Sequence, residues 1–167
     1  GAHYVLTASI HENVVSNWNW IEALIASVPI AILVMLIVWI NQFQDAPSDA
    51  AVGKNTWVVR TAEKGEWMKL EKPLRLYKQF MIEAFVAVAL VGALSFFTDF
   101  GTVYAFMALI PLALVWKAFK MADEWMIKWN NPNADRQKVP YELLLVNVST
   151  IGIHFLTGIL LAVAYIL

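Results

Sequence analysis

Residues 21–40 read IEALIASVPIAILVMLIVWI, and this run decides the fold class of the chain. It carries one charge, Glu22, and matches the ~20 residues that a helix needs to cross the hydrocarbon core of a bilayer. Three more apolar runs follow, at 80–97, 101–119 and 143–167. In a chain of 167 residues that is 60% hydrophobic, these runs leave too few polar residues to cover a soluble core. The sequence therefore predicts an all-α integral membrane protein, with four transmembrane helices in a single transmembrane domain over 1–167.

The basic residues predict the orientation in the membrane. All 12 Lys and Arg lie within two segments, 54–78 and 117–138. Because Lys and Arg are retained on the cytoplasmic side, we expect loops 41–79 and 120–142 to be cytoplasmic and both termini non-cytoplasmic, in the cell (inner) membrane. The lipid bilayer is then the expected partner of the helices, and a net charge of −1 gives no reason to expect nucleic acid. The chain has no cysteine, which excludes disulfides and thiolate metal sites.

Four tryptophans lie near the ends of the first and third runs: Trp18, Trp20, Trp39 and Trp116. Tryptophan is enriched where a membrane meets water, because its ring is apolar and its N–H is polar. We therefore expect these four rings to anchor the helices in the lipid interface.

The segment after the first run carries two carboxylates, Asp45 and Asp49, four residues apart. If the segment is helical, positions i and i+4 are neighbours on one face, so the two side chains could share one cation. Mg²⁺ needs only one or two carboxylates and takes its other ligands from water and substrate phosphates. Lys54 and Arg60 would then balance the phosphate charge. The pattern indicates a diphosphate held through Mg²⁺, and its alternative is a solvated helix face, which such a pair forms more often.

A family resemblance favours the first interpretation. Residues 28–60 read VPIAILVMLIVWINQFQDAPSDAAVGKNTWVVR, which resembles the second aspartate-rich motif of the UbiA superfamily of intramembrane prenyltransferases, in its MenA-like form. The matching positions are Asn41, Asp45, Asp49, Gly53, Lys54, Thr56 and Arg60. One departure is Pro47, where relatives often carry a further acidic residue. The resemblance implies that the chain is the C-terminal portion of a nine-helix bundle, because the first aspartate-rich motif of the family has no counterpart here.

The resemblance also implies a function. This is the Mg²⁺-dependent transfer of a prenyl group from an allylic polyprenyl diphosphate to an aromatic acceptor, as in menaquinone biosynthesis by the dihydroxynaphthoate prenyltransferases. Asp45 and Asp49 would be the catalytic, metal-binding residues, and Lys54, Arg60 and Asn41 would bind the diphosphate. A missing N-terminal half or a partner chain would complete the site. The alternative is a non-catalytic helical subunit of a larger membrane complex.

Polar residues within the apolar runs are fewer and have simpler interpretations. Asn147, Thr150, His154 and Thr157 recur at helical spacing in the last run, so they should face protein or a cavity rather than lipid. We expect them to form hydrogen bonds between helices, with the lining of a substrate cavity as the alternative. Glu83, near the start of the second run, is expected to pair with a basic residue at the interface.

Overall fold

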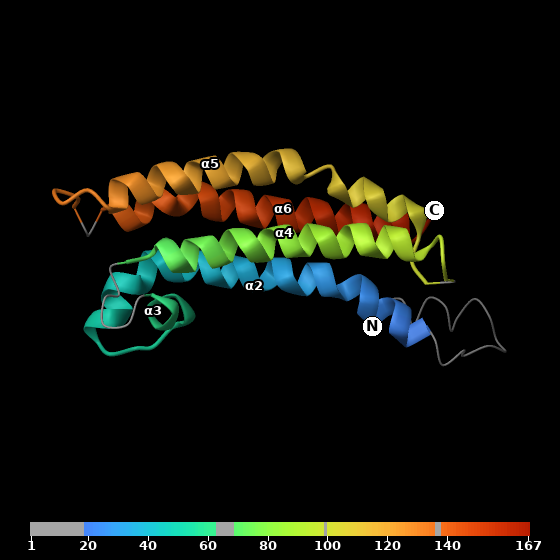
Figure 1. The fold of residues 1–167 in the computed structure, drawn as a ribbon, viewed down its shortest axis with the longest axis horizontal. Helices are drawn as coiled ribbons and strands as arrows, with labels where there is room; N and C mark the ends of the chain where they lie inside the picture. The colour runs from blue at the N-terminus through green and yellow to red at the C-terminus, as the bar shows by residue number, and fades with distance from the viewer. Residues whose placement is uncertain (1–18, 63–68, 99, 136–137) are drawn as a thin grey trace.

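The computed structural model describes residues 19–62, 69–98, 100–135 and 138–167, and throughout these ranges the chain forms helices and turns without a strand. The described helices form four long segments, which run back and forth along the length of the molecule (Figure 1). They are α2 (Asn19–Ala51), α4 (Glu71–Leu94), η1 (Val103–Leu109) continued by α5 (Leu112–Trp129), and η2 (Val139–Leu143) continued by α6 (Leu144–Ala164). All four are long and apolar enough to cross a membrane. The predicted all-α fold with four potential membrane spans is therefore confirmed.

The first helix is much longer than its apolar run. It continues past Ile40 to Ala51, because the chain goes on burying one face at helical spacing, with Phe43 and Ala46 both fully buried. Pro47 lies inside the helix without ending it. Asp45 and Asp49 therefore stand on a helix, and the loop expected from residue 41 begins only after Ala51.

A glycine ends this first helix. Gly53 has a φ of 72°, a left-handed conformation that glycine adopts without strain. The N–H of Gly53 donates to the carbonyl of Ala50 at 3.1 Å, and the N–H of Lys54 donates to the carbonyl of Asp49 at 2.8 Å. These two bonds form a Schellman motif. The motif turns the chain back, and the short helix α3 (Trp57–Thr61) follows.

The second and third segments also differ from their predicted bounds. The second helix begins at Glu71 rather than at residue 80, and Pro73 in its first turn is compatible with a helix start because N–H groups there lack helical partners. The third segment breaks at Pro111, which separates η1 from α5. Glu83 accepts a hydrogen bond from Gln79 of its own helix at 2.9 Å, so its expected pairing with a basic residue is not the contact that the structure shows.

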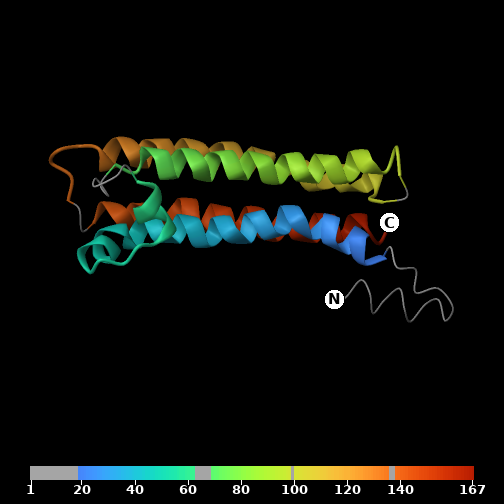
Figure 2. The ribbon, with the colours of Figure 1, turned by 60° about the horizontal axis from the view of Figure 1, so that its bottom comes forward.

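The helices pack as a bundle in which α2 lies against α4 and α6, and α5 lies against α6 (Figures 1 and 2). Asn147 of α6 donates from its amide nitrogen to the amide oxygen of Asn41 on α2 at 2.7 Å. Thr150 of α6 shares a hydrogen bond of 2.7 Å with Tyr77 of α4. Two members of the polar stripe on α6 therefore join helices, as predicted. In the same stripe, Nδ1 of His154 and Oγ1 of Thr157 are buried without a hydrogen-bond partner among the residues described.

The tryptophans do not all face lipid. Trp39 is buried inside the bundle, where its Nε1 donates to the carbonyl of Pro73 on α4 at 3.3 Å, so the prediction of lipid anchoring is wrong for this ring. Trp116 is exposed on α5, but it lies in the middle of the segment Val103–Trp129 rather than near its end, so its anchoring at the lipid interface stays a prediction. Trp18 and the side chain of Trp20 lie outside the described residues.

Ion pairs gather at the end of the bundle where α2 and α5 end and α4 and α6 begin. Lys78–Asp123 and Lys128–Glu142 at 2.6 Å join helical segments, whereas Lys138–Asp135 at 3.4 Å lies within the connection between α5 and η2. The candidate site lies at this same charged end.

Candidate functional site

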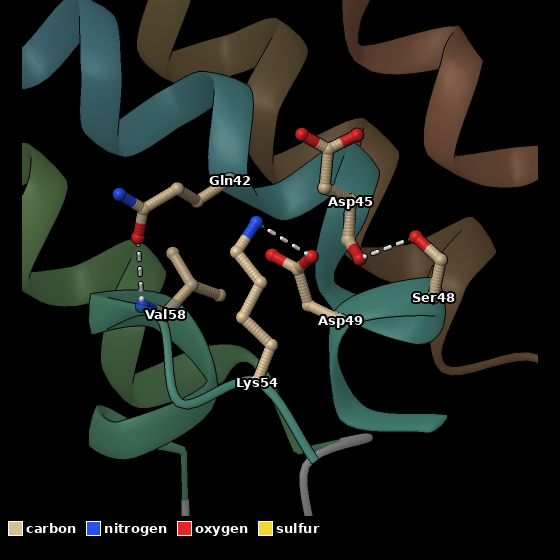
Figure 3. Close-up of polar contacts among 6 residues, drawn as sticks. All are labelled: Gln42, Asp45, Ser48, Asp49, Lys54 and Val58. Atoms are coloured by element: carbon tan, nitrogen blue, oxygen red, sulfur yellow. Dashed lines mark hydrogen bonds and ion pairs between the residues drawn. The ribbon is translucent and has the colours of Figure 1, made fainter. Parts of the chain in front are cut away.

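One face of the last turns of α2 carries the polar residues of the candidate site. Gln42, Asp45 and Asp49 follow one another at spacings of i+3 and i+4, which places their side chains along one side of a helix. Because α2 continues through this segment, the predicted common face for the two aspartates is present. Figure 3 shows Gln42 and Asp49 flanking the side chain of Lys54.

Asp49 and Lys54 form an ion pair. Nζ of Lys54 lies 3.0 Å from Oδ1 of Asp49. The Schellman motif around Gly53 brings the two residues together, since it holds the backbone of Lys54 against the carbonyl of Asp49. Local backbone geometry therefore brings the ammonium group of Lys54 to Asp49, without the help of a tertiary contact.

The Asp49 carboxylate is buried, and only one of its two oxygens has a partner among the described residues. The residue is 7% exposed, and its second oxygen, Oδ2, is buried without a hydrogen-bond partner among the described residues. An unpaired buried carboxylate oxygen is costly because it has lost its water without gaining a donor. The Lys54 side chain is 63% exposed, so water screens it, and this lysine alone does not satisfy the carboxylate. The arrangement favours a further positive ligand at Oδ2.

Asp45 has a different environment from Asp49. It is exposed, and its side chain makes no hydrogen bond or ion pair with the described residues; its backbone carbonyl accepts a hydrogen bond from Oγ of Ser48 at 2.9 Å. In Figure 3 its carboxylate lies to one side of the Asp49–Lys54 pair. Within the described ranges, no three Asp, Glu, His or Cys side chains gather in one metal-binding group. The unpartnered Oδ2 of Asp49 fits Mg²⁺ as one carboxylate ligand, since this ion commonly binds proteins through one or two carboxylates and fills its other positions with water and phosphate oxygens.

Two other predicted site residues are placed differently. The amide oxygen of Asn41 accepts from Asn147, so this part of its side chain joins α2 to α6 rather than facing a ligand. Arg60 lies near the end of α3 and is exposed, and no ion pair to Asp45 or Asp49 is present. The structure thus brings together Asp49 and Lys54, and leaves Asn41 and Arg60 apart from them.

Sequence reasoning missed Gln42. Its side-chain oxygen accepts a hydrogen bond of 3.2 Å from the backbone N–H of Val58, in the first turn of α3. This bond fixes α3 against the end of α2. Gln42 precedes Asp49 by seven residues, two helical turns, and that spacing was the signal from which its place on the site face could have been found.

The chemistry available at this site is that of a cation and an anion bound side by side. Asp49 presents a carboxylate with the ammonium group of Lys54 on one of its oxygens, and Asp45 presents a second carboxylate one helical turn earlier. Such a set can hold a divalent cation together with a phosphate or diphosphate group. Comparisons with protein-family models, with curated proteins and with solved structures give no match to the chain.

Proposed function

We propose that the C-terminal end of α2 forms part of a Mg²⁺–diphosphate site of a membrane prenyltransferase of the UbiA type. The observation that carries the proposal is the buried carboxylate of Asp49, with Lys54 on one oxygen and no partner on the other. Its support is the position of Asp45 on the same face of the helix, in a segment that resembles the second aspartate-rich motif of that superfamily. The acceptor would be an aromatic ring, as in menaquinone-type quinone biosynthesis.

In the proposed reaction, an allylic C–O bond breaks and leaves positive charge on carbon and negative charge on the diphosphate. The allylic C–O bond of the prenyl diphosphate breaks, and its electron pair leaves with the diphosphate. A ring carbon of the aromatic acceptor then forms the new C–C bond and loses its proton or its carboxyl group, which restores the aromatic ring. Bound Mg²⁺ supplies positive charge to the leaving diphosphate oxygens.

The residues of this chain would bind and orient the leaving group. Asp49 and Asp45 would hold the cation through their carboxylates. Lys54, already beside Asp49, would donate to diphosphate oxygens as a point charge. The resemblance assigns the first aspartate-rich motif to an N-terminal half or to a partner chain, which would face these residues across the diphosphate. Four apolar helices fit this chemistry, because a long prenyl tail dissolves in the bilayer.

The test is the replacement of each aspartate by asparagine in the full-length protein. Asp49→Asn and Asp45→Asn keep the side-chain size and remove the charge that holds the cation. We expect prenyl transfer to fall by about a hundredfold or more, the scale seen when a group that stabilises developing charge is removed. Asp123→Asn is the matched control, because Asp123 lies at the same end of the bundle and pairs with Lys78 away from the site.

The same variants separate the two classes of function. In a prenyltransferase, the site variants lose turnover while their helical content and thermal unfolding stay like those of the control. In a non-catalytic subunit, Asp45→Asn and Asp49→Asn are silent in every assay of the complex. Unchanged prenyl transfer in the Asp49→Asn protein would overturn the proposed function.

A further inference from the structure

An apolar groove begins where the polar face of the site ends. It is lined by Met35, Val38, Trp39, Gln42 and Trp57, and its volume is about 270 Å³. A cavity of about 150 Å³ with apolar walls already holds a benzene-sized molecule. The groove therefore has room for a larger, branched piece of hydrocarbon.

Two helices form the walls of this groove. The ring of Trp57 on α3 meets the ring of Trp39 on α2 edge to face, with 5.7 Å between the ring centroids. Gln42 holds α3 in this position through its bond to the N–H of Val58. Trp39 in turn is held by its own bond to Pro73. The aromatic walls are therefore fixed by hydrogen bonds before any ligand is present.

The groove and the charged site share one face of α2. Met35, Gln42 and Asp49 are seven residues apart in succession, so they lie almost in line along the helix. Gln42 lines the groove and lies about 10 Å along the axis from Asp49, at 1.5 Å per residue. Moving from Asp49 to Met35, the surface changes from a carboxylate and an ammonium to hydrocarbon and aromatic rings.

We propose that this groove binds the part of the prenyl tail next to the diphosphate, and that Val38 and Trp57 determine the size of the tail accepted there. The inference rests on the proposed function, since Asp49 and Lys54 must hold the head group for the tail to enter the groove. A prenyl diphosphate has the same order of polarity as this face: its anionic head would lie at Asp49 and Lys54, and its branched apolar tail would lie in the groove. A lipid acyl chain would fill the same groove without depending on Asp49, and that difference makes the two occupants separable.

The first experiment locates the tail. A prenyl diphosphate with a benzophenone in its tail is irradiated with the purified protein in lipid nanodiscs containing Mg²⁺. We expect crosslinks on Met35 or Trp57, and we expect them to disappear in Asp49→Asn. Crosslinks on these residues that persist in Asp49→Asn would show that hydrocarbon enters the groove without the head group. Crosslinks confined to other helices would likewise overturn the inference.

The second experiment fills the groove. Val38→Trp places a large ring in it, and Val86→Trp on α4 is the matched control, since Val38 and Val86 are 55% and 51% exposed and only Val38 lines the groove. Binding of inorganic diphosphate and of geranylgeranyl diphosphate is measured for both variants with Mg²⁺. We expect Val38→Trp to lower the affinity for geranylgeranyl diphosphate about tenfold, the effect of losing roughly ten carbon–carbon contacts. Its affinity for inorganic diphosphate should stay unchanged.

The two ligands distinguish the two possible failures. If inorganic diphosphate with Mg²⁺ does not bind the unchanged protein, or binds equally to Asp49→Asn, the proposed site itself is wrong. If inorganic diphosphate binds through Asp49 but Val38→Trp binds geranylgeranyl diphosphate as tightly as Val86→Trp does, the site stands and the groove is not its tail subsite.

Discussion

Lys54→Met is expected to change the binding of two ligands in opposite directions. In the structure, Lys54 occupies one oxygen of Asp49 at 3.0 Å, so a cation that uses the whole carboxylate has to displace it. With 63% of the Lys54 side chain exposed, the pair belongs to the screened class worth about 0.2–1 kcal/mol. Removing the ammonium should therefore tighten Mg²⁺ binding by about one and a half to fivefold. The same change should weaken Mg²⁺-dependent binding of inorganic diphosphate, because the phosphate oxygens lose a charged donor.

The assay is isothermal titration calorimetry on the protein in lipid nanodiscs, first with Mg²⁺ alone and then with diphosphate at saturating Mg²⁺. Lys138→Met is the control: it removes a lysine at the same end of the bundle that is paired with Asp135 at 3.4 Å and is 84% exposed. We expect the control to change neither affinity. The reasoning is refuted if Lys54→Met weakens Mg²⁺ binding, or if Lys138→Met reproduces both effects.

Three further predictions concern the bundle around the site. A double-mutant cycle of Asn41→Ala and Asn147→Ala in an unfolding assay should give a coupling of about 0.6 kcal/mol, the usual value for hydrogen bonds between membrane helices; zero coupling would contradict the structural role of Asn41. Gly101→Ala should lower the free energy of unfolding more than Gly53→Ala. Both glycines have positive φ, but only at Gly101 would the new methyl group meet a backbone oxygen, at 2.3 Å; equal losses would argue against that close approach. Phe97→Cys gives a protein with a single, exposed thiol, and a membrane-impermeant maleimide should label it from outside intact cells; labelling only after permeabilisation would reverse the predicted orientation.

Helix bounds were the least predictable part of the fold. Hydropathy places the end of the first span at Ile40, where the apolar residues stop. The helix itself continues to Ala51, because Phe43 and Ala46 still find a core to bury against. A hydropathy run marks where a helix is surrounded by lipid, whereas the helix ends where its hydrogen-bonded turns end, here at Ala51, just before the turn at Gly53.

The candidate site was predictable only in part. The spacing of Asp45 and Asp49 places them on one helical face, and the structure has that helix. It does not follow from spacing that Asp49 is buried while Asp45 is exposed, since burial depends on which neighbours cover each position. Arg60 shows the same limit: it lies eleven residues beyond Asp49, and the path of the chain through α3 leaves it apart from the aspartates.

The sequence by itself determined that this protein is helical and has four segments able to cross a membrane. Crossing a bilayer is a local requirement, because each segment must satisfy its own backbone hydrogen bonds and present an apolar surface over its length. Tertiary structure alone decided which polar groups meet. Asn41 and Asn147 are 106 residues apart, and their contact depends on the rotation and height of two helices against each other. The same packing sets Trp39 and Trp57 edge to face beside Gln42 and so forms the groove, which no local pattern in the sequence encodes.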